Sequence, residues 1–209
     1  MRDVCARLTP LGVMVLSLLS EGDMHPYEMI RLLRHRHDDR IIAITNGTLY
    51  HTVSRLERAG LVAEVGVDRE GNRPERTTYT LTEPGREMVI EWVRRELPRI
   101  DRPVEFRVAL SEAHDLGRDD AVELLSARRD ALAGEHRQYR DGLENARALG
   151  VPDQFLVEVE RQEVLLAAEL GWMDDLIDRV ARPDFPWGRE EIPPEHHDRY
   201  IAQRKAAQL

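Results

Sequence analysis

One stretch, residues 46–62 (NGTLYHTVSRLERAGLV), constrains the fold of this chain more than any other. Leu49, Val53 and Leu56 recur at spacings of four and three, so on a helix they share one face. The pattern predicts a helix over residues 48–59, with Asn46 as its N-cap and Gly60 as its stop. The opposite face carries only small, hydrogen-bonding or cationic side chains: Gly47, Thr48, His51, Ser54, Arg55 and Arg58. Such a helix suits the major groove of DNA, although an ordinary amphipathic surface helix shows the same pattern.

A strand, a polar loop and a second strand follow this helix. Residues 61–65 predict a short strand, and residues 77–81 alternate as a strand does. The intervening residues 68–76 contain Gly71-Asn72 and Pro74 and predict a turn. Helix, strand, basic loop and strand is the order of elements in a winged helix. The loop arginines would then lie within reach of phosphates or a minor groove; they are Arg69, Arg73 and Arg76. The competing interpretation is that the loop is only the solvated tip of a hairpin.

This region resembles the signature of PadR-type transcriptional regulators. GTLYHTVSRLERAGLV and RTTYTLTEPGRE contain the motifs Gly-x-Leu-Tyr, Arg-Leu-Glu-x-x-Gly-Leu and Tyr-x-Leu-Thr-x-x-Gly-Arg. His51 stands where many members have proline. The resemblance is specific over residues 8–97 and looser to about residue 181. It implies a dimeric regulator that binds double-stranded operator DNA and represses transcription, with an all-helical C-terminal region that makes the dimer.

We predict eight DNA-contacting side chains from this helix and wing. Arg55 and Arg58 are expected to contact DNA from the groove face, and Tyr50, on the flank, is expected to reach a phosphate. The full set is Thr48, Tyr50, His51, Arg55, Arg58, Arg69, Arg73 and Arg76. The alternative that stays open is a winged-helix module for protein interaction or dimerisation without specific DNA binding.

The predicted winged-helix domain spans residues 1–97. Its first helix begins at Thr9-Pro10, runs to about residue 20 and is apolar on almost every side, which indicates burial on both sides. Thr82 caps a further helix that runs to about residue 97, and residues 41–44 predict a short strand that could join the wing. A second helix begins at Pro26, with an inner face expected to hold Tyr27, Ile30 and Leu33.

Residues 98–182 predict a helical dimerisation domain. Pro98 and Pro103 bracket a break, a helix follows over residues 104–116, and two long runs repeat apolar residues at spacings of three and four around a turn at residues 150–152. The runs contain polar interruptions, and we expect Glu163 to pair with Arg129 or His136. The expected dimer contacts are Leu132, Tyr139, Leu143, Leu166, Leu170, Met173 and Ile177.

The resemblance also implies a small aromatic effector, because related regulators bind planar aromatic compounds between their winged domains. Trp92 is the only tryptophan before the C-terminal region, so we predict an effector site beside its helix. A core role for Trp92 is the competing interpretation. Residues 183–209 form a Pro-rich tail without a family match, either an arm across a neighbour or a loosely held end.

Charge, cysteine content and the absence of catalytic motifs argue against several other classes of protein. Residues 1–97 carry 14 Arg and 15 Asp or Glu (net −1), whereas residues 98–209 carry 16 Lys or Arg and 24 Asp or Glu (net −8), so the acidic excess lies away from the proposed DNA surface. The single cysteine, Cys5, excludes a disulfide framework and a Cys-rich metal site. No catalytic triad, phosphate-binding glycine loop or His-Glu-x-x-His motif is present, so we expect no enzyme, cofactor or metal. Residues 11–19 are too short an apolar run to span a bilayer, and we expect a cytoplasmic protein without membrane contact.

Overall fold

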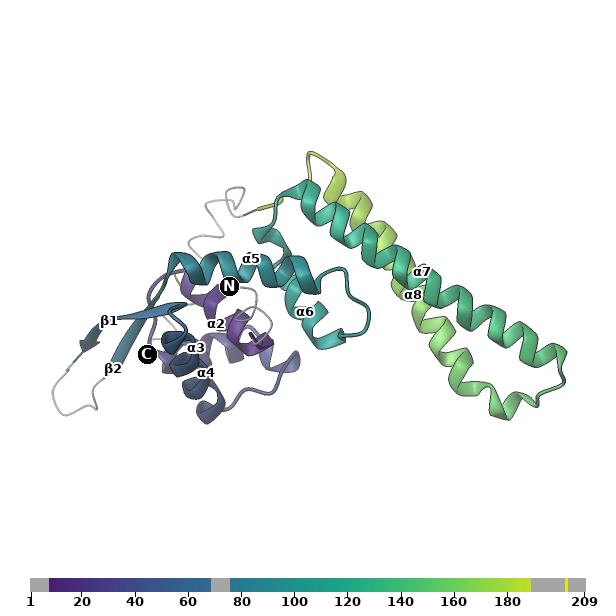
Figure 1. Cartoon of the computed structure of the whole chain (residues 1–209), viewed down its shortest axis with the longest axis horizontal. Helices are drawn as coiled ribbons and strands as arrows, with labels where there is room; N and C mark the ends of the chain where they lie inside the picture. The colour runs from purple at the N-terminus through teal and green to yellow at the C-terminus, as the bar shows by residue number, and fades with distance from the viewer. Residues whose placement is uncertain (1–7, 69–75, 189–201, 203–209) are drawn as a thin grey trace.

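The computed structural model describes residues 8–68, 76–188 and 202, and for residues 67, 68 and 76 it describes the backbone alone. Figure 1 shows two parts: helices α2 to α6 gather beside a β-hairpin, and α7 and α8 project away from them as a long antiparallel pair. The predicted fold class, mainly helical with an N-terminal winged helix, is confirmed. The elements are α2 (Pro10–Ser20), α3 (Pro26–His35), the 3₁₀ turn η1 (Asp38–Arg40), α4 (Asn46–Arg58), β1 (Val62–Asp68), β2 (Arg76–Leu81), α5 (Glu83–Glu96), α6 (Pro103–Ser111), η2 (Ala113–Asp115), α7 (Arg118–Ala148), η3 (Asp153–Phe155) and α8 (Val157–Ala181).

Helix α2 lies at the centre of the winged-helix part. Thr9 caps it, because its hydroxyl oxygen accepts a hydrogen bond from the Gly12 amide at 3.2 Å, and Pro10 occupies the first helical position. The helix packs against α4 and β2 and also against α5 and α6. Nearly all of its side chains are therefore buried, as its lack of a polar face predicted.

The wing is a two-stranded antiparallel hairpin in which Val62 lies opposite Leu81. Its register shifts between Glu64 and Gly66. Met24 pairs with the outer edge of β2, where it exchanges two backbone hydrogen bonds of 3.0 Å with Tyr79. The predicted strand over residues 41–44 is wrong. Its isoleucines instead pack partly buried against the core after η1, because strand propensity is weak and burial of the side chains decides where they lie.

One predicted inner residue of α3 lies at the surface. Tyr27 is 48% exposed, and the guanidinium carbon of Arg31 lies 6.0 Å from the centre of its ring. The buried stripe runs through Pro26, Met29, Ile30 and Leu33, which occupy the positions i, i+3, i+4 and i+7. Tyr27 therefore falls outside the stripe, whereas Ile30 and Leu33 are buried as predicted.

The buried core continues across the proline-bracketed break. Helix α6 is shorter than predicted and ends at Ser111, and its buried residues Phe106, Val108 and Ala109 join the same core as α2 and α5. The side chain of Arg128 in α7 is also buried, and its guanidinium lies 3.4 Å from the centre of the Phe106 ring. This guanidinium donates to the Glu169 carboxylate at 2.8 Å and to the Arg99 carbonyl. It thereby ties both long helices to the break.

Helices α7 and α8 pack on each other within one chain, turning at Gly150, which has a φ of 76°. Four of the predicted dimer contacts, Leu132, Leu143, Leu166 and Met173, are buried in this intramolecular seam. The other three, Tyr139, Leu170 and Ile177, are partly buried against the core. One chain thus already covers much of the surface that the periodicity predicted for the dimer.

The predicted polar pairing in the seam is present. His136 Nε2 lies 2.7 Å from Glu163 Oε1, one of the two pairings expected from the sequence. The other candidate, Arg129, instead donates to Asp174 at 2.7 Å. Both pairs link α7 to α8, so the polar interruptions help to fix the register of the hairpin.

None of the helices in the described residues is long and apolar enough to cross a membrane.

Candidate nucleic-acid interface

Helix α4 rests on the core through one face. Leu49, Val53 and Leu56 are each at most 2% exposed, as predicted, and the helix packs against α2, α3 and β1. Thr52 is buried beside them and donates its hydroxyl hydrogen to the Thr48 carbonyl at 2.8 Å. With one face held in this way, the opposite face of α4 is presented to solvent.

The N-cap of α4 is Thr45 rather than Asn46. The Thr45 hydroxyl accepts from the Thr48 amide at 3.1 Å, and the Thr48 hydroxyl accepts from the Thr45 amide at 3.0 Å. This reciprocal pair satisfies the cap without the Asn46 side chain, which lies exposed at the first helical position. The hydroxyl of Thr48, one of the predicted DNA contacts, is therefore already engaged in the cap. The predicted stop at Gly60 is confirmed, with a φ of 71°.

The exposed face of α4 holds most of the predicted helix contacts. His51, Ser54 and Arg58 are exposed, and Arg55 is half-buried. Arg58 Nε donates to the Ser54 carbonyl at 3.2 Å, which holds its guanidinium along the outer surface of the helix. This cluster offers hydroxyl, imidazole and guanidinium groups of the kind that contact phosphates and base edges.

Tyr50 lies on the flank of this face and is 45% exposed. Its ring packs edge-on against His25, with the ring centres 6.4 Å apart. His25 caps α3 by accepting from the Tyr27 amide at 3.0 Å. The Tyr50 ring is thus positioned by the start of the neighbouring helix.

The wing arginines are only partly placed. Arg69 and Arg73 lie outside the described residues, and so does the side chain of Arg76, whose backbone begins β2. On the same hairpin, burial raises the pKa of the Tyr79 hydroxyl, and the Glu57 and Glu64 carboxylates raise it further. Tyr79 is therefore uncharged at neutral pH.

The start of α5 is bonded to the end of α4. The Thr82 hydroxyl donates to the Gly60 carbonyl at 2.8 Å and accepts from the Gly85 amide at 3.2 Å. The Thr82 amide donates to the Leu61 carbonyl at 3.2 Å. One residue thus caps α5, as predicted, and fixes the end of α4 against it.

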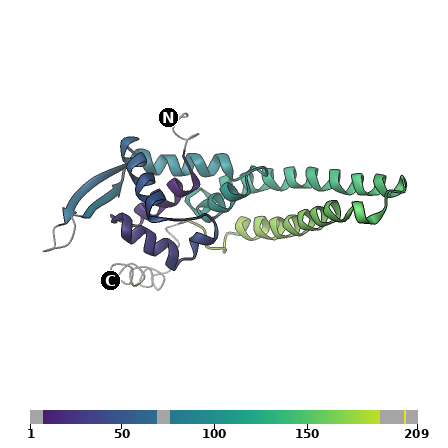
Figure 2. The same cartoon turned by 90° about the horizontal axis from the view of Figure 1, so that it is seen from below.

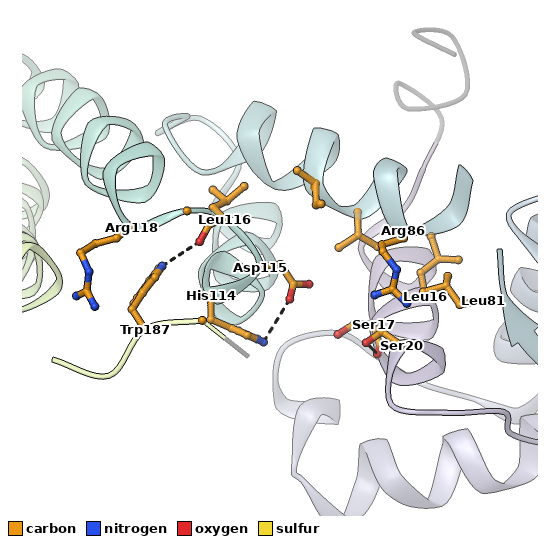
Figure 3. Close-up of a pocket in the computed structure, with 14 residues that line it drawn as sticks. Leu16, Ser17, Ser20, Leu81, Arg86, His114, Asp115, Leu116, Arg118 and Trp187 are labelled. Carbon is orange, nitrogen blue, oxygen red and sulfur yellow. Dashed lines mark hydrogen bonds and ion pairs between the residues drawn. The ribbon is translucent and has the colours of Figure 1, made fainter. Parts of the chain in front are cut away.

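Trp92, the predicted effector-site residue, is a core residue in this structure. It is fully buried, and its indole N–H donates to the Leu8 carbonyl at 3.2 Å. A cavity of about 560 Å³ does lie beside α5, but Trp92 does not line it. Its walls come from α2, the end of β2, α5, η2 and residues 187–188 of the tail (Figure 3).

The C-terminal segment is held against this cavity. Trp187 Nε1 donates to the Leu116 carbonyl at 3.0 Å. The Arg118 guanidinium donates to the carbonyls of Val180 and Arg182, both at 2.8 Å, and of Phe185 at 2.9 Å. Trp187 thereby forms part of the cavity wall, which no local pattern in the sequence indicated.

Comparison with known proteins identifies the winged-helix part. Residues 15–91 match the model of the transcriptional regulator PadR-like family. Among curated proteins, none matches the chain.

Several solved structures are similar in fold. One is Bacillus subtilis PadR in complex with operator DNA, which is 17% identical over 81% of this chain and 98% of that chain, with a TM-score of 0.40. Another is smu.1604c from Streptococcus mutans UA159, which is 17% identical over 80% of this chain and 98% of that chain, with a TM-score of 0.37. A third is Bacillus subtilis PadR in complex with p-coumaric acid, which is 15% identical over 83% of this chain and 100% of that chain, with a TM-score of 0.36.

The family match agrees with the sequence motifs and with the geometry of α4, β1, β2 and α5. It also agrees with the prediction that the chain is not an enzyme, because the family is one of transcriptional regulators. Residues 15–91, which hold α4 and the wing strands, are thus similar in sequence to the transcriptional regulator PadR-like family.

Proposed function

We propose that this protein is a dimeric, sequence-specific DNA-binding repressor that acts in the cytoplasm and is relieved by a small aromatic effector. The observation that carries DNA binding is the exposed face of α4, held on a rigid core inside a PadR-like segment. That face displays exposed His51, Ser54 and Arg58. Asn46 joins them, because the Thr45–Thr48 cap leaves its side chain exposed at the end of the helix that would enter the groove.

Arg58→Ala is expected to weaken binding to the operator by about 1–3 kcal/mol, which is roughly 5- to 150-fold, if the guanidinium reads a guanine edge. Asn46→Ala is expected to relax the preference at a single base position. Both are measured by fluorescence-anisotropy titration on a duplex that the purified protein selects from random sequence. Arg140→Ala, which removes an equal charge from the exposed side of α7, is the control and should bind as the parent does. Unchanged affinity of the Arg58 and Asn46 variants would refute this interface.

The salt dependence of the same titration separates DNA recognition from a protein-interaction role. Neutralising phosphates releases counterions, so the affinity of a DNA-binding protein falls steeply as salt rises. A protein-interaction module would show no selected duplex and no such slope. The wing residues Arg69, Arg73 and Arg76 are proposed as general phosphate contacts that contribute to this slope.

The dimer is proposed to form through the outer face of α8. Val157, Val164, Leu165 and Trp172 are between 43% and 61% exposed and follow the positions i, i+7, i+8 and i+15. They form one stripe opposite the buried Leu166 and Met173. An apolar stripe beside a completed hairpin supports association with a second copy, in which residues 98–182 act as the dimerisation domain.

The effector is proposed to bind in the cavity beside α5. Leu16, Val89 and Ile90 give apolar walls, and Ser17 and Arg86 supply polar groups. This combination suits a planar aromatic compound that carries an acidic group.

Titration with a panel of aromatic carboxylates is expected to quench the tryptophan fluorescence that Trp187 contributes. A Trp187→Phe variant should lose this response, because Trp187 lines the cavity. A Trp92→Phe variant should keep it, because Trp92 is enclosed in the core. A response that disappears with Trp92 and persists without Trp187 would place the effector elsewhere.

A further inference from the structure

Three metal-ligating side chains meet around the turn η2, in the wall of the cavity. Glu112, His114 and Asp115 each offer a ligand atom, and these atoms all lie within 4.8 Å of one another. His114 and Asp115 both line the cavity. Figure 3 shows the imidazole of His114 turned towards the Asp115 carboxylate.

A backbone contact determines which nitrogen of His114 carries the proton. His114 Nδ1 lies 3.0 Å from the Ser111 carbonyl oxygen. A carbonyl oxygen only accepts hydrogen bonds, so Nδ1 must be the donor, and the neutral imidazole presents a lone pair at Nε2. This arrangement, with Nδ1–H on a backbone carbonyl and Nε2 open, is the one that metal-ligating histidines adopt.

The lone pair of Nε2 faces negative charge. His114 Nε2 lies 3.7 Å from Asp115 Oδ1, too far for a hydrogen bond between them. This separation places both ligand atoms within reach of a single metal ion, because Zn–N and Zn–O bonds are each about 2 Å long.

The third carboxylate is positioned from another helix. Glu112 Oε2 accepts from the Ser17 hydroxyl of α2 at 2.5 Å, and Glu112 Oε1 lies 3.3 Å from the Ser111 hydroxyl. Hydrogen bonds of this kind orient carboxylate ligands in metal sites and raise their affinity.

We propose that Glu112, His114 and Asp115 bind a divalent transition-metal ion of the Zn²⁺ class. One imidazole and two carboxylates form a suitable ligand set for such an ion, and three protein ligands leave a coordination position open towards the cavity. The ion would join η2 to α2 through Glu112 and Ser17, and hence the helical region to the winged helix. Its binding does not depend on the proposed DNA-binding function.

The test is isothermal titration of Zn²⁺ into the full-length chain after chelation and dialysis, without DNA. One ion per chain is expected. His114→Ala and Asp115→Asn should each weaken its binding at least about tenfold, and Ser17→Ala, which removes only the hydrogen bond to Glu112, also by about tenfold. Circular dichroism verifies that each variant is folded. If His114→Ala does not fold, the Zn²⁺ affinity of the isosteric variant Asp115→Asn decides whether the site binds the ion.

The tail supplies the matched control, because His196 and His197 could bind Zn²⁺ without a built site. The double variant H196A/H197A should retain the bound ion and its affinity. Loss of binding in this double variant, parent-like binding by His114→Ala, or no binding by the parent chain would each overturn the proposal. DNA titrations without metal report separately on the proposed function.

Discussion

Gly85→Ala is expected to lower the free energy of unfolding by roughly 3 kcal/mol or more, because the new methyl group has no space. A Cβ at Gly85 would collide with the backbone carbonyl oxygen of Leu61 and would lie only 2.8 Å from Leu81 Cδ1. The leucine side chain can rotate, but the Leu61 carbonyl is held by the Thr82 amide. Helix α5 cannot withdraw either, because Trp92 anchors it in the core.

The expected loss is measured by urea unfolding followed by circular dichroism. Gly142→Ala is the control: this glycine lies exposed inside α7, and a Cβ there meets nothing within 4 Å. Alanine at that position should stabilise the helix by about 0.5–1 kcal/mol. If both variants showed the same small stabilisation, α5 would not pack on Leu61 as described. Because Thr82 and Gly85 hold the end of α4, the damaged fold should also bind DNA poorly.

Leu165→Glu is expected to convert the proposed dimer into a monomer and to weaken operator binding about 100-fold or more. The carboxylate would lie in the centre of the outer stripe of α8, between Val164 and Trp172, where burial against a second copy would leave it unpaired. A winged-helix dimer engages two half-sites together, so a monomer loses the contribution of the second recognition helix. Chain folding should be retained, because Leu165 is 46% exposed in the single chain.

Sedimentation velocity gives the oligomeric state, and the anisotropy titration gives the affinity for the operator. Gln138→Glu adds the same charge to an exposed position of α7 and should remain dimeric with parent-like DNA binding. A Leu165→Glu variant that stays dimeric would exclude the outer face of α8 as the interface. A dimer that dissociates with both variants would instead indicate general charge repulsion.

Local sequence determined the parts of this protein that depend on nearest neighbours along the chain. The spacing of Leu49, Val53 and Leu56 defines the buried face of α4, and Thr9 and Thr82 begin α2 and α5 because their hydroxyls reach amides three residues on. Gly60 and Gly150 end helices because they accept positive φ. Periodicity also predicted that Glu163 pairs with Arg129 or His136 across the two runs, and the structure selects His136.

Where neighbouring residues offered equivalent choices, contacts seen only in the structure decided between them. Asn46 and Thr45 are both good N-caps, and the reciprocal bonds between Thr45 and Thr48, which are themselves local, selected Thr45. That selection exposes Asn46 and engages Thr48, which changes the expected DNA contacts. The isoleucines of residues 41–44 suit a strand, but in the folded chain they pack partly buried against the core instead.

Long-range packing decided the rest. Periodicity predicts that Leu132 and Met173 are buried, but it does not say whether the helix that covers them belongs to the same chain. In the structure, α7 and α8 of one chain cover each other. The cavity beside α5 is assembled from α2, α5, η2 and Trp187, which are separated by up to about 170 residues along the chain. No local pattern encodes such a meeting, because it depends on where α6 and the tail pack once the core has formed.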